Sequence, residues 1–430
     1  MNLRLDALSR LNRDAKLLIT VSGVSAVSFF GIQMLLKVLY VLRLGHGPEF
    51  VGWFNGTGAL AYMTMGIPSG ALGGRFGTRR IMMIGAVVMI AGMLFLPLTE
   101  SVPSWAWNAW PFVSQVTLTA GWSMFNVNLV PALMAVTTAS DRDQTYALNN
   151  ASRLLGTVAG TLVGGQLPGL FARFLDRSLD APDPYRYALF VGAAFATTSF
   201  APLIMMRPVQ GTVVRPQVRT EARGAFPKLP IALMIGYVYL RHAGWAACKS
   251  FSNAYMDVEL HLSASSIGLI TGAGQFLAML GSLVTPRLAA RRSNGWTLVA
   301  STVGIAIFLV PMALFPHWIP ATVGRLGIFV LAAVWISALQ VFQMELVESQ
   351  WRSLAYGTVS MAMGLGFSTI SLSGGYIIAA AGYQTLFWIG SGVSLLAATV
   401  LGFLLNRRIL VPAAATATEH SPVDPQTAPT

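Results

Sequence analysis

Charged residues are scarce in this chain. Of its 430 residues only 10% are Asp, Glu, Lys or Arg, whereas 54% are hydrophobic. An ordinary soluble domain has roughly a quarter of its residues charged, and a soluble fold of this length needs a charged outer surface. Long stretches of this sequence contain no charge at all. The composition therefore excludes an ordinary soluble protein, and a lipid bilayer is the solvent that fits it.

Cysteine and histidine are scarce as well. The single cysteine, Cys248, excludes an intrachain disulfide and a cysteine-rich metal cluster. Only one of the five histidines, His242, falls within a long apolar run. A membrane-embedded enzyme would need a catalytic constellation, such as histidines close to carboxylates, and none is visible. We therefore expect no enzymatic activity, no cofactor and no metal site.

The apolar runs predict the fold class. A bilayer core about 30 Å thick requires about 20 apolar residues per helix. Runs of that size lie at 17–44, 50–73, 81–99, 109–136, 146–171, 187–206, 230–255, 264–285, 297–315, 322–344, 354–380 and 385–405. The sequence therefore predicts an all-α integral membrane protein with about twelve transmembrane helices.

Polar segments divide the chain. The segment 208–229 is rich in Arg and separates a six-helix bundle at 17–207 from a second one at 230–406. It is typical of a cytoplasmic linker. Residues 1–16 form a basic N-terminal segment, and the tail at 407–430 is rich in Ala, Thr and Pro with little to bury. We expect most of this tail to be disordered.

The basic residues predict the orientation. The net charge is +12, and the Lys and Arg residues lie mostly in short loops, unlike the soluble basic face with interleaved aromatics that binds nucleic acid. Sorting them by alternate loops places most of them on the side of the N-terminus, which is the cytoplasmic side in most membrane proteins. We expect a multi-pass protein of the inner (plasma) membrane with both termini cytoplasmic. It should contact lipid, bind no nucleic acid and be a monomer.

The two halves of the chain repeat weakly. Gly52, Leu72 and Arg75 match Gly268, Leu288 and Arg291 at a constant offset of 216. Arg142, Tyr146, Leu155, Gly156, Gly164 and Gly165 match Arg352, Tyr356, Leu365, Gly366, Gly374 and Gly375 at an offset of 210. Parallel six-helix repeats place a substrate site at their interface near the midplane, where rocking of the halves can open it to either side.

The loop after the second predicted helix carries the most specific motif. Residues 70–80 read GALGGRFGTRR. This stretch resembles the signature of the major facilitator superfamily, with Gly74 where that family usually has an aspartate. The resemblance covers essentially the whole chain except the tail, and it implies a transporter fold. It also implies a conformational role for these residues of the motif: Gly70, Arg75, Gly77, Arg79 and Arg80.

A glycine stripe on the fifth predicted helix is the second motif. Its members are Gly156, Gly160, Gly164 and Gly165. The stretch is similar to the glycine and proline motif of the superfamily's antiporters, with Thr161 in place of the proline. Small residues four apart also let any two helices approach closely, so a purely structural role is the alternative.

Four cations lie within predicted helices, whereas no Asp or Glu lies deep in one. A cation costs on the order of 3 kcal/mol or more at the bilayer centre unless it pairs, reaches the headgroups or faces water. Arg241 lies about 17 Å into its helix, which is near the midplane. Lys37 and Lys249 lie about 30 Å along theirs and either extend to the outer headgroups or face the interior. We expect Arg241 to be functional.

Arg153 allows two interpretations. It lies about 10 Å into the fifth helix, and it either contacts substrate or stabilises the bundle through an acid. The candidate partners are Asp141, Asp143 and Glu345. Glu345 ends the tenth predicted helix seven residues before Arg352, so these two either form a cytoplasmic gate pair or are solvated at the helix end.

Polar and aromatic residues recur at helical spacing on four helices. The resemblance implies that the first, fourth, seventh and tenth helices line the substrate cavity. The residues concerned are Phe30, Gln33 and Lys37; Gln115, Thr119, Trp122 and Asn126; His242, Trp245, Lys249 and Ser252; and Ile336, Gln340 and Gln343. Amides on such stripes can also hold helices together. His242 is either a titrating group or a hydrogen-bonded packing residue.

The sequence predicts a secondary transporter that moves a small solute by alternating access. We expect an importer or exchanger of a small organic anion held by Arg241 with help from Arg153, because a cationic cavity attracts anions. A proton or a counter-anion would be the coupling partner. The alternatives are efflux of hydrophobic compounds, suggested by the glycine stripe and by 11 Trp and 23 Phe, and a non-transporting sensor of the same fold.

Overall fold

A computed structural model describes residues 11–138, 141–207, 228–347 and 351–410 of the chain. Most of the predicted linker, most of the tail and the first ten residues lie outside this part. Within it the secondary structure is helical, with no strand. The prediction of an all-α fold is confirmed.

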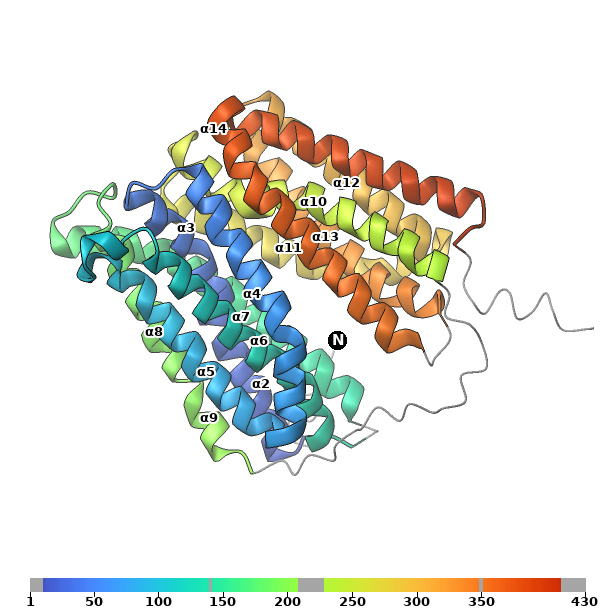
Figure 1. The fold of residues 1–430 in the computed structure, drawn as a ribbon, viewed down its shortest axis with the longest axis horizontal. Coiled ribbons are helices and arrows are strands. Elements are labelled where there is room, and N and C mark those ends of the chain that lie inside the picture. Colours follow the sequence, from blue (N-terminus) through green and yellow to red (C-terminus); the bar gives the residue numbers. More distant parts are fainter. Residues whose placement is uncertain (1–10, 139–140, 208–227, 348–350, 411–430) are drawn as a thin grey trace, which may run out of the picture.

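The first half of the chain forms one bundle (Figure 1). Its first span consists of α2 (Arg13–Ala26), the π-helical segment η1 (Val27–Gln33) and α3 (Met34–Arg43). The other elements are α4 (Pro48–Phe76), α5 (Thr78–Phe95), the short 3₁₀ segments η2 (Leu96–Ser101) and η3 (Ser104–Ala106), α6 (Trp110–Val136), α7 (Arg142–Leu175), α8 (Asp183–Thr197) and α9 (Phe200–Met205).

The second half forms a second bundle. It contains α10 (Lys228–Val258), α11 (Ala264–Arg292), α12 (Asn294–Leu314), α13 (Trp318–Glu345) and α14 (Arg352–Asn406). Gly382 has non-helical backbone angles, φ 80° and ψ 168°, and divides α14 into two arms. A positive φ is accessible to glycine at little cost. The two arms correspond to the eleventh and twelfth predicted helices, so each of the twelve predicted apolar runs corresponds to helical structure in the described residues.

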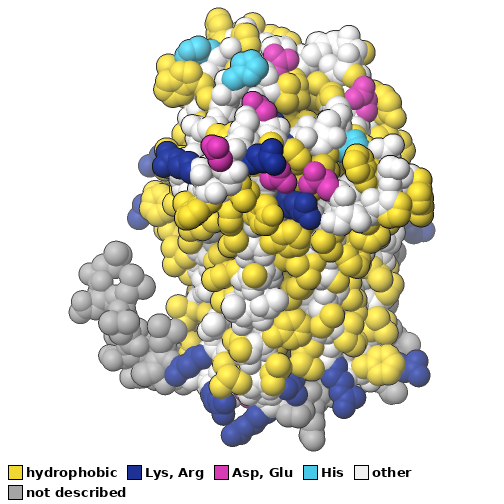
Figure 2. Space-filling model, turned by 90° about the vertical axis from the view of Figure 1, so that its left-hand side faces the viewer, with side chains coloured by type: hydrophobic (Ala, Val, Ile, Leu, Met, Phe, Trp, Pro, Cys, Tyr) yellow, Lys and Arg dark blue, Asp and Glu magenta, His cyan; other side chains and the backbone are white. Residues whose placement is uncertain are grey.

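The surface has an apolar belt. Eight helical stretches in the described part are long and apolar enough to cross a membrane by length and composition. On the face shown in Figure 2, hydrophobic side chains cover the middle, Lys and Arg lie at the lower edge, and acidic and basic side chains lie together in the upper part. Exposed apolar side chains such as Ile67 and Phe174 fit a lipid environment, because they would be costly in water.

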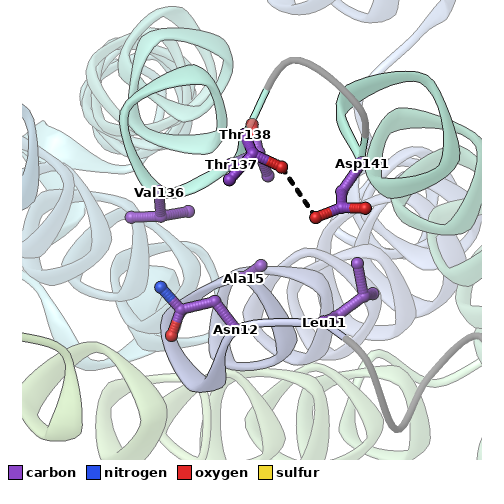
Figure 3. A pocket seen from close by; sticks show the side chains of 7 residues that line it. All are labelled: Leu11, Asn12, Ala15, Val136, Thr137, Thr138 and Asp141. Atoms are coloured by element: carbon purple, nitrogen blue, oxygen red, sulfur yellow. Dashed lines mark hydrogen bonds between the residues drawn. The ribbon is translucent and has the colours of Figure 1, made fainter.

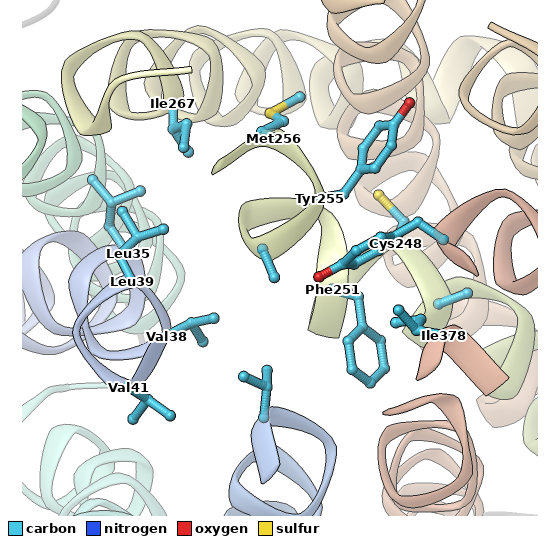
Figure 4. Close-up of a cluster of buried hydrophobic side chains, with 14 of the residues drawn as sticks. Leu35, Val38, Leu39, Val41, Cys248, Phe251, Tyr255, Met256, Ile267 and Ile378 are labelled. Carbon is cyan, nitrogen blue, oxygen red and sulfur yellow. The ribbon is translucent and has the colours of Figure 1, made fainter. Parts of the chain in front are cut away.

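The two bundles meet at one end of the molecule, which we call the closed end; it contains the connections 44–47 and 259–263. A cluster of buried apolar residues crosses the bundle interface here and includes Leu39 and Val41 of α3 together with Phe251 and Tyr255 of α10 (Figure 4). The opposite end, which contains the basic connections near 75–80 and 287–292, is called the basic end.

Two close helix contacts join the bundles, and each rests on glycines. Where α4 meets α14, a Cβ on Gly52 would lie 2.5 Å from the carbonyl oxygen of Ser371, next to Gly375. Where α11 meets α7, a Cβ on Gly268 would lie 2.9 Å from the Cα of Gly165. Gly52 corresponds to Gly268, and Gly375 to Gly165, in the sequence repeat. The two contacts are therefore equivalent under the internal repeat.

Toward the basic end the bundles diverge. A Cβ added at Gly66 of α4 or at Gly357 of α14 would meet nothing within 4 Å, and one at Gly70 would meet only Val127 of its own bundle. Figure 1 shows α4 and the first arm of α14 separating in this direction. The structure is thus closed at one end of the bundle interface and open at the other.

Candidate functional site

Five cations lie inside the membrane-spanning region: Lys37, Arg153, Arg241, Lys249 and Arg325. The ion pairs between described residues are Arg43–Asp257, Arg177–Asp183 and Arg186–Glu100, so none of the five interior cations has an acidic partner there. Arg325 was not predicted from the sequence to be an interior cation, because it lies near the start of the predicted run at 322–344. The structure begins α13 at Trp318, four residues earlier, which places Arg325 deeper in the helix.

Lys37 points into the protein. Its side chain is only 3% exposed, and its Nζ donates a hydrogen bond of 3.2 Å to Gln115 of α6. The same Nζ lies 5.3 Å from the centre of the Phe54 ring on α4. The alternative that Lys37 reaches the outer headgroups is therefore wrong.

Lys249 and Arg325 lie beside one aromatic ring. The Nζ of Lys249 and the Cζ of Arg325 are each 5.7 Å from the centre of the Phe329 ring on α13. Arg325 is 4% exposed and donates to Asn253 at 2.5 Å and to the sulfur of Met256 at 3.3 Å. Lys249 is exposed, whereas its chain neighbours Cys248 and Ser250 are buried. The contact with the Phe329 ring favours an interior position for Lys249 over the headgroup alternative.

Arg241 is stacked on tryptophans. Its Cζ lies 3.9 Å from the centre of the Trp335 ring and 5.6 Å from that of Trp245. The side chain is 2% exposed, and its Nε and one terminal nitrogen have no hydrogen-bond partner. His242 beside it is buried, packs edge-on against both tryptophans and has its Nδ1 3.3 Å from the carbonyl oxygen of Val238. This arrangement favours a packing role for His242.

Arg153 repeats this arrangement in the first bundle. Its Cζ lies 5.6 Å from the centre of the Phe30 ring and 5.8 Å from that of Trp122. Trp122 in turn stacks on Phe29. Arg153 forms no ion pair with a described acid, and the side chain of its candidate partner Asp143 lies outside the described residues. Each bundle therefore holds one arginine on a pair of aromatic rings.

Some side chains of the predicted polar stripes form hydrogen bonds, whereas others have polar atoms without a partner among the described residues. Thr119 donates to the carbonyl oxygen of Gln115, and Asn126 donates to the hydroxyl of Tyr62 at 3.0 Å. Gln340 is exposed. The buried Gln33 has no partner for either amide atom, and the buried Gln343 has none for its oxygen. Such orphan groups are costly in a protein interior and are common at binding sites.

Glu345 and Arg352 do not form a gate pair in this conformation. The carboxylate of Glu345 accepts from Asn294 at 3.3 and 3.4 Å. Arg352 donates to the carbonyl oxygen of Met344 at 3.2 Å. Glu345 therefore joins the end of α13 to the start of α12, and Arg352 caps the end of α13.

An ion pair at the closed end was not predicted from the sequence. Arg43, the last residue of α3, donates two hydrogen bonds of 2.7 and 2.8 Å to the carboxylate of Asp257 near the end of α10. Arg43 also donates to the carbonyl oxygen of Leu179 and to the hydroxyl of Tyr185. The pair joins the two bundles. The spacing of Arg43 and Asp257, both near predicted helix ends, gave no signal that they meet.

A separate cavity of about 210 Å³ lies at the basic end of the first bundle (Figure 3). It is lined by Leu11, Asn12, Ala15, Val136, Thr137, Thr138 and Asp141. Thr138 donates to Asp141 at 2.7 Å. None of the interior cations or predicted cavity residues lines it, so it is distinct from the candidate site.

The family model of the Major Facilitator Superfamily matches residues 18–253 and 233–427. The chain belongs to this superfamily. Solved structures of other superfamily transporters have the same fold. The nucleoside transporter NupG has a TM-score of 0.71 at 14% identity and covers 91% of this chain and 99% of its own. The xylose transporter XylE from E. coli has a TM-score of 0.69 at 14% identity, with 89% and 95% covered.

Two similar superfamily proteins are named as exporter or resistance protein. The enterobactin exporter EntS of Citrobacter koseri is 24% identical over 304 residues, which are 68% of this chain and 67% of that protein. The multidrug resistance protein MdtH of Proteus mirabilis is 25% identical over 141 residues, which are 33% of this chain and 34% of MdtH. The match thus spans only about a third of the length of MdtH. Family and fold are those of multi-pass membrane transporters and not of enzymes.

The superfamily signature ends one helix and anchors the next. Gly77 has φ 92° and terminates α4, which favours glycine at this position. Arg79 donates to the carbonyl oxygens of Leu203 and Ile204 at 3.0 and 2.7 Å and so caps the end of α9. Arg75, Arg80 and the unusual Gly74 are exposed. The loop thereby fixes α9 to the start of α5 at the basic end.

The glycine stripe of α7 has two faces. Added Cβ atoms at Gly156, Gly160 and Gly164 would meet the first span, at Gly23, Val27 and Ile32 respectively. Gly165 instead faces α11 of the other bundle. The stripe permits close packing on both sides, as the structural interpretation requires.

Proposed function

We propose that this superfamily member exports an organic anion that also has an aromatic or apolar part, by alternating access. The observation that carries the proposal is the set of five interior cations without an acidic partner among the described residues. Each would cost on the order of 3 kcal/mol at the bilayer centre if left uncompensated. A bound anion supplies the missing charge, and a cationic hollow attracts anions from solution.

The aromatic surroundings support a substrate with an apolar part. Arg241 lies over Trp335 and Trp245, and Arg153 lies over Phe30 and Trp122. Apolar ligand sites are typically lined by such rings, with a few polar groups that fix orientation. One such arginine and ring pair belongs to each bundle, so a substrate between the bundles can contact both.

Outward transport is supported by the relatives and by the charges. EntS is named as an exporter, and its match covers two thirds of both chains. The basic end carries most of the loop arginines, which favours the cytoplasmic side of an inner membrane and cytoplasmic termini. The open end would then receive substrate from the cytoplasm. Export thus replaces import as the preferred direction, whereas the anionic substrate is kept.

Reconstitution into proteoliposomes tests the proposal. A panel of aromatic carboxylates and sulfonates is compared with the matched uncharged amides, which keep the ring but lose the charge. We expect transport of anions and at least a tenfold loss with Arg241→Gln, whereas Arg173→Gln, which changes an exposed arginine near the closed end, should transport normally. Transport of the amides without the anions, or full anion transport by Arg241→Gln, would contradict the proposal.

A second candidate is efflux of hydrophobic compounds. It is favoured by the same aromatic pairs and by the name of the MdtH relatives. In that case a deletion strain should become sensitive to uncharged and cationic hydrophobic compounds, and Arg241→Gln should restore resistance as well as the wild type does. Failure of Arg241→Gln to restore resistance would point back to the anion.

A further inference from the structure

The interior cations fall into two groups. Arg153 and Arg241 lie on aromatic rings, one in each bundle. The other three, Lys37, Lys249 and Arg325, lie closer to the closed end and are called the cation triad. They come from α3, α10 and α13, so the triad is shared by both bundles.

The members of the triad are close enough to repel one another. Lys249 and Arg325 are each 5.7 Å from the same ring centre, so their cationic centres are at most twice 5.7 Å, or 11.4 Å, apart. The charge of Lys249 repels that of Arg325, and it also repels that of Lys37 in the other bundle. Three like charges in one partly enclosed region repel one another, and an anion bound among them would offset that repulsion.

Unpartnered polar groups accompany these charges. Arg325 is buried, and its Nε has no hydrogen-bond partner. Gln33 is fully buried, lies one helical turn before Lys37 and has no partner for either amide atom. Leaving a buried donor unpaired is energetically costly. Among the described residues no acceptor satisfies these donors, and an oxyanion would offer several lone pairs.

We propose that Lys37, Lys249 and Arg325 form the subsite for the substrate's oxyanion, a carboxylate, sulfonate or phosphate. The apolar part of the substrate lies toward the ring pairs beneath Arg241 and Arg153. This inference rests on the proposed function and assigns the charged group to different residues from those that the sequence favoured.

The position of the subsite constrains the substrate. Lys249 lies eight residues after Arg241 on α10, which corresponds to about 12 Å along the helix. The substrate should therefore be elongated, with its anionic group roughly that far from its apolar part. Because the triad draws on both bundles, a bound oxyanion also offsets the repulsion between Lys37 and Lys249. Binding should thus stabilise the conformation that is closed at this end.

Thermal unfolding of the purified full-length protein tests the subsite. The probes are 7-phenylheptane-1-sulfonate, whose extended chain lets the ring reach the aromatic pairs, and the uncharged 7-phenylheptane-1-sulfonamide. We expect the sulfonate to raise the unfolding temperature of the wild type and the sulfonamide to raise it much less. Lys249→Gln and Lys37→Gln should each weaken sulfonate binding at least tenfold, and Lys249→Arg should retain it. Since Lys249 is exposed, its replacement should leave the fold intact.

Control variants separate the possible failures. Arg173→Gln removes an exposed cation outside the triad and should bind as the wild type does. Equal sulfonate binding by wild type, Lys37→Gln and Lys249→Gln would overturn the subsite but leave anion export standing. Stabilisation of the wild type by the sulfonamide, with none by the sulfonate, would overturn both.

Discussion

At the scale of single residues, the Arg43–Asp257 pair has the clearest energetic role. The aspartate side chain is 2% exposed, and both of its oxygens accept from the guanidinium. Removing one partner of a buried ion pair commonly costs 3–5 kcal/mol, because the other charge is left unpaired. The pair joins α3 to α10 across the bundle interface. Its energy therefore stabilises the closed end in particular.

We predict that Asp257→Asn opens the closed end. Loss of even about 2 kcal/mol would shift a two-state equilibrium roughly thirtyfold. Spin labels at cysteines replacing Ser104 and His317, in a Cys248→Ser background, would report the distance between the bundles at this end by pulsed electron resonance. The distance should lengthen. Asp183→Asn removes a weaker pair within the first bundle, with Arg177 at 4.0 Å, and should leave it unchanged. An unchanged distance in Asp257→Asn would refute the role of the pair.

The sequence identified interior cations but not the partners of charges near helix ends. Lys37, Arg153, Arg241 and Lys249 were recognisable because a cation far inside an apolar run is costly wherever the helix ends. Arg325 and Asp257 lie within a few residues of predicted helix ends, where uncertainty of about four residues decides between loop and interior. Their contacts also depend on the packing of distant helices, which residue spacing does not encode.

At the scale of secondary structure, α7 packs against two different partners. A Cβ on Gly31 of η1 would lie 2.5 Å from the Cα of Gly160, inside the first bundle. A Cβ on Gly165 would lie 3.0 Å from the Cα of Gly268, in the other bundle. The first contact lies within one bundle. The second joins the two bundles at the closed end, so opening of that end by alternating access would break only the second.

We therefore predict different effects for two substitutions on one helix. Gly160→Leu should destabilise the bundle by at least 1–3 kcal/mol, as overpacking does, and lower its unfolding temperature. Gly165→Leu should lengthen the label distance at the closed end with a smaller loss of stability. Gly169→Leu is the matched control, because a Cβ there meets nothing within 4 Å. Equal unfolding temperatures for the Gly160 and Gly165 variants would argue against this division.

The positions of the helices could be predicted from the sequence, but local departures from α-helical geometry could not. Each apolar run corresponds to a helical span, and the gap expected after 380 coincides with the break at Gly382. The π-helical segment Val27–Gln33 was not predicted. This segment crosses α7 where Gly31 packs against Gly160. Such a local change in helical winding depends on the neighbouring helix. The hydrophobic periodicity of one segment does not indicate which helix packs against it.

At the scale of the whole molecule, charge differs between the two ends. The closed end carries acids such as Glu49, Asp183 and Glu259 beside its arginines, whereas the basic end is dominated by Lys and Arg, as Figure 2 shows for one face. Cytoplasmic loops are enriched in Lys and Arg. We therefore expect the basic end, and with it the open side of the bundle interface, to face the cytoplasm.

Cysteine labelling in intact cells tests this orientation. In a Cys248→Ser background, a cysteine replacing His317 at the closed end should react with a membrane-impermeant maleimide from outside. One replacing Ser293 at the basic end should react only after permeabilisation. Both positions are exposed, so a difference reports sidedness and not burial. If the Ser293→Cys thiol reacted in intact cells, the open end would face outward. The triad would then receive its anion from outside, and uptake, not export, would follow from the same geometry.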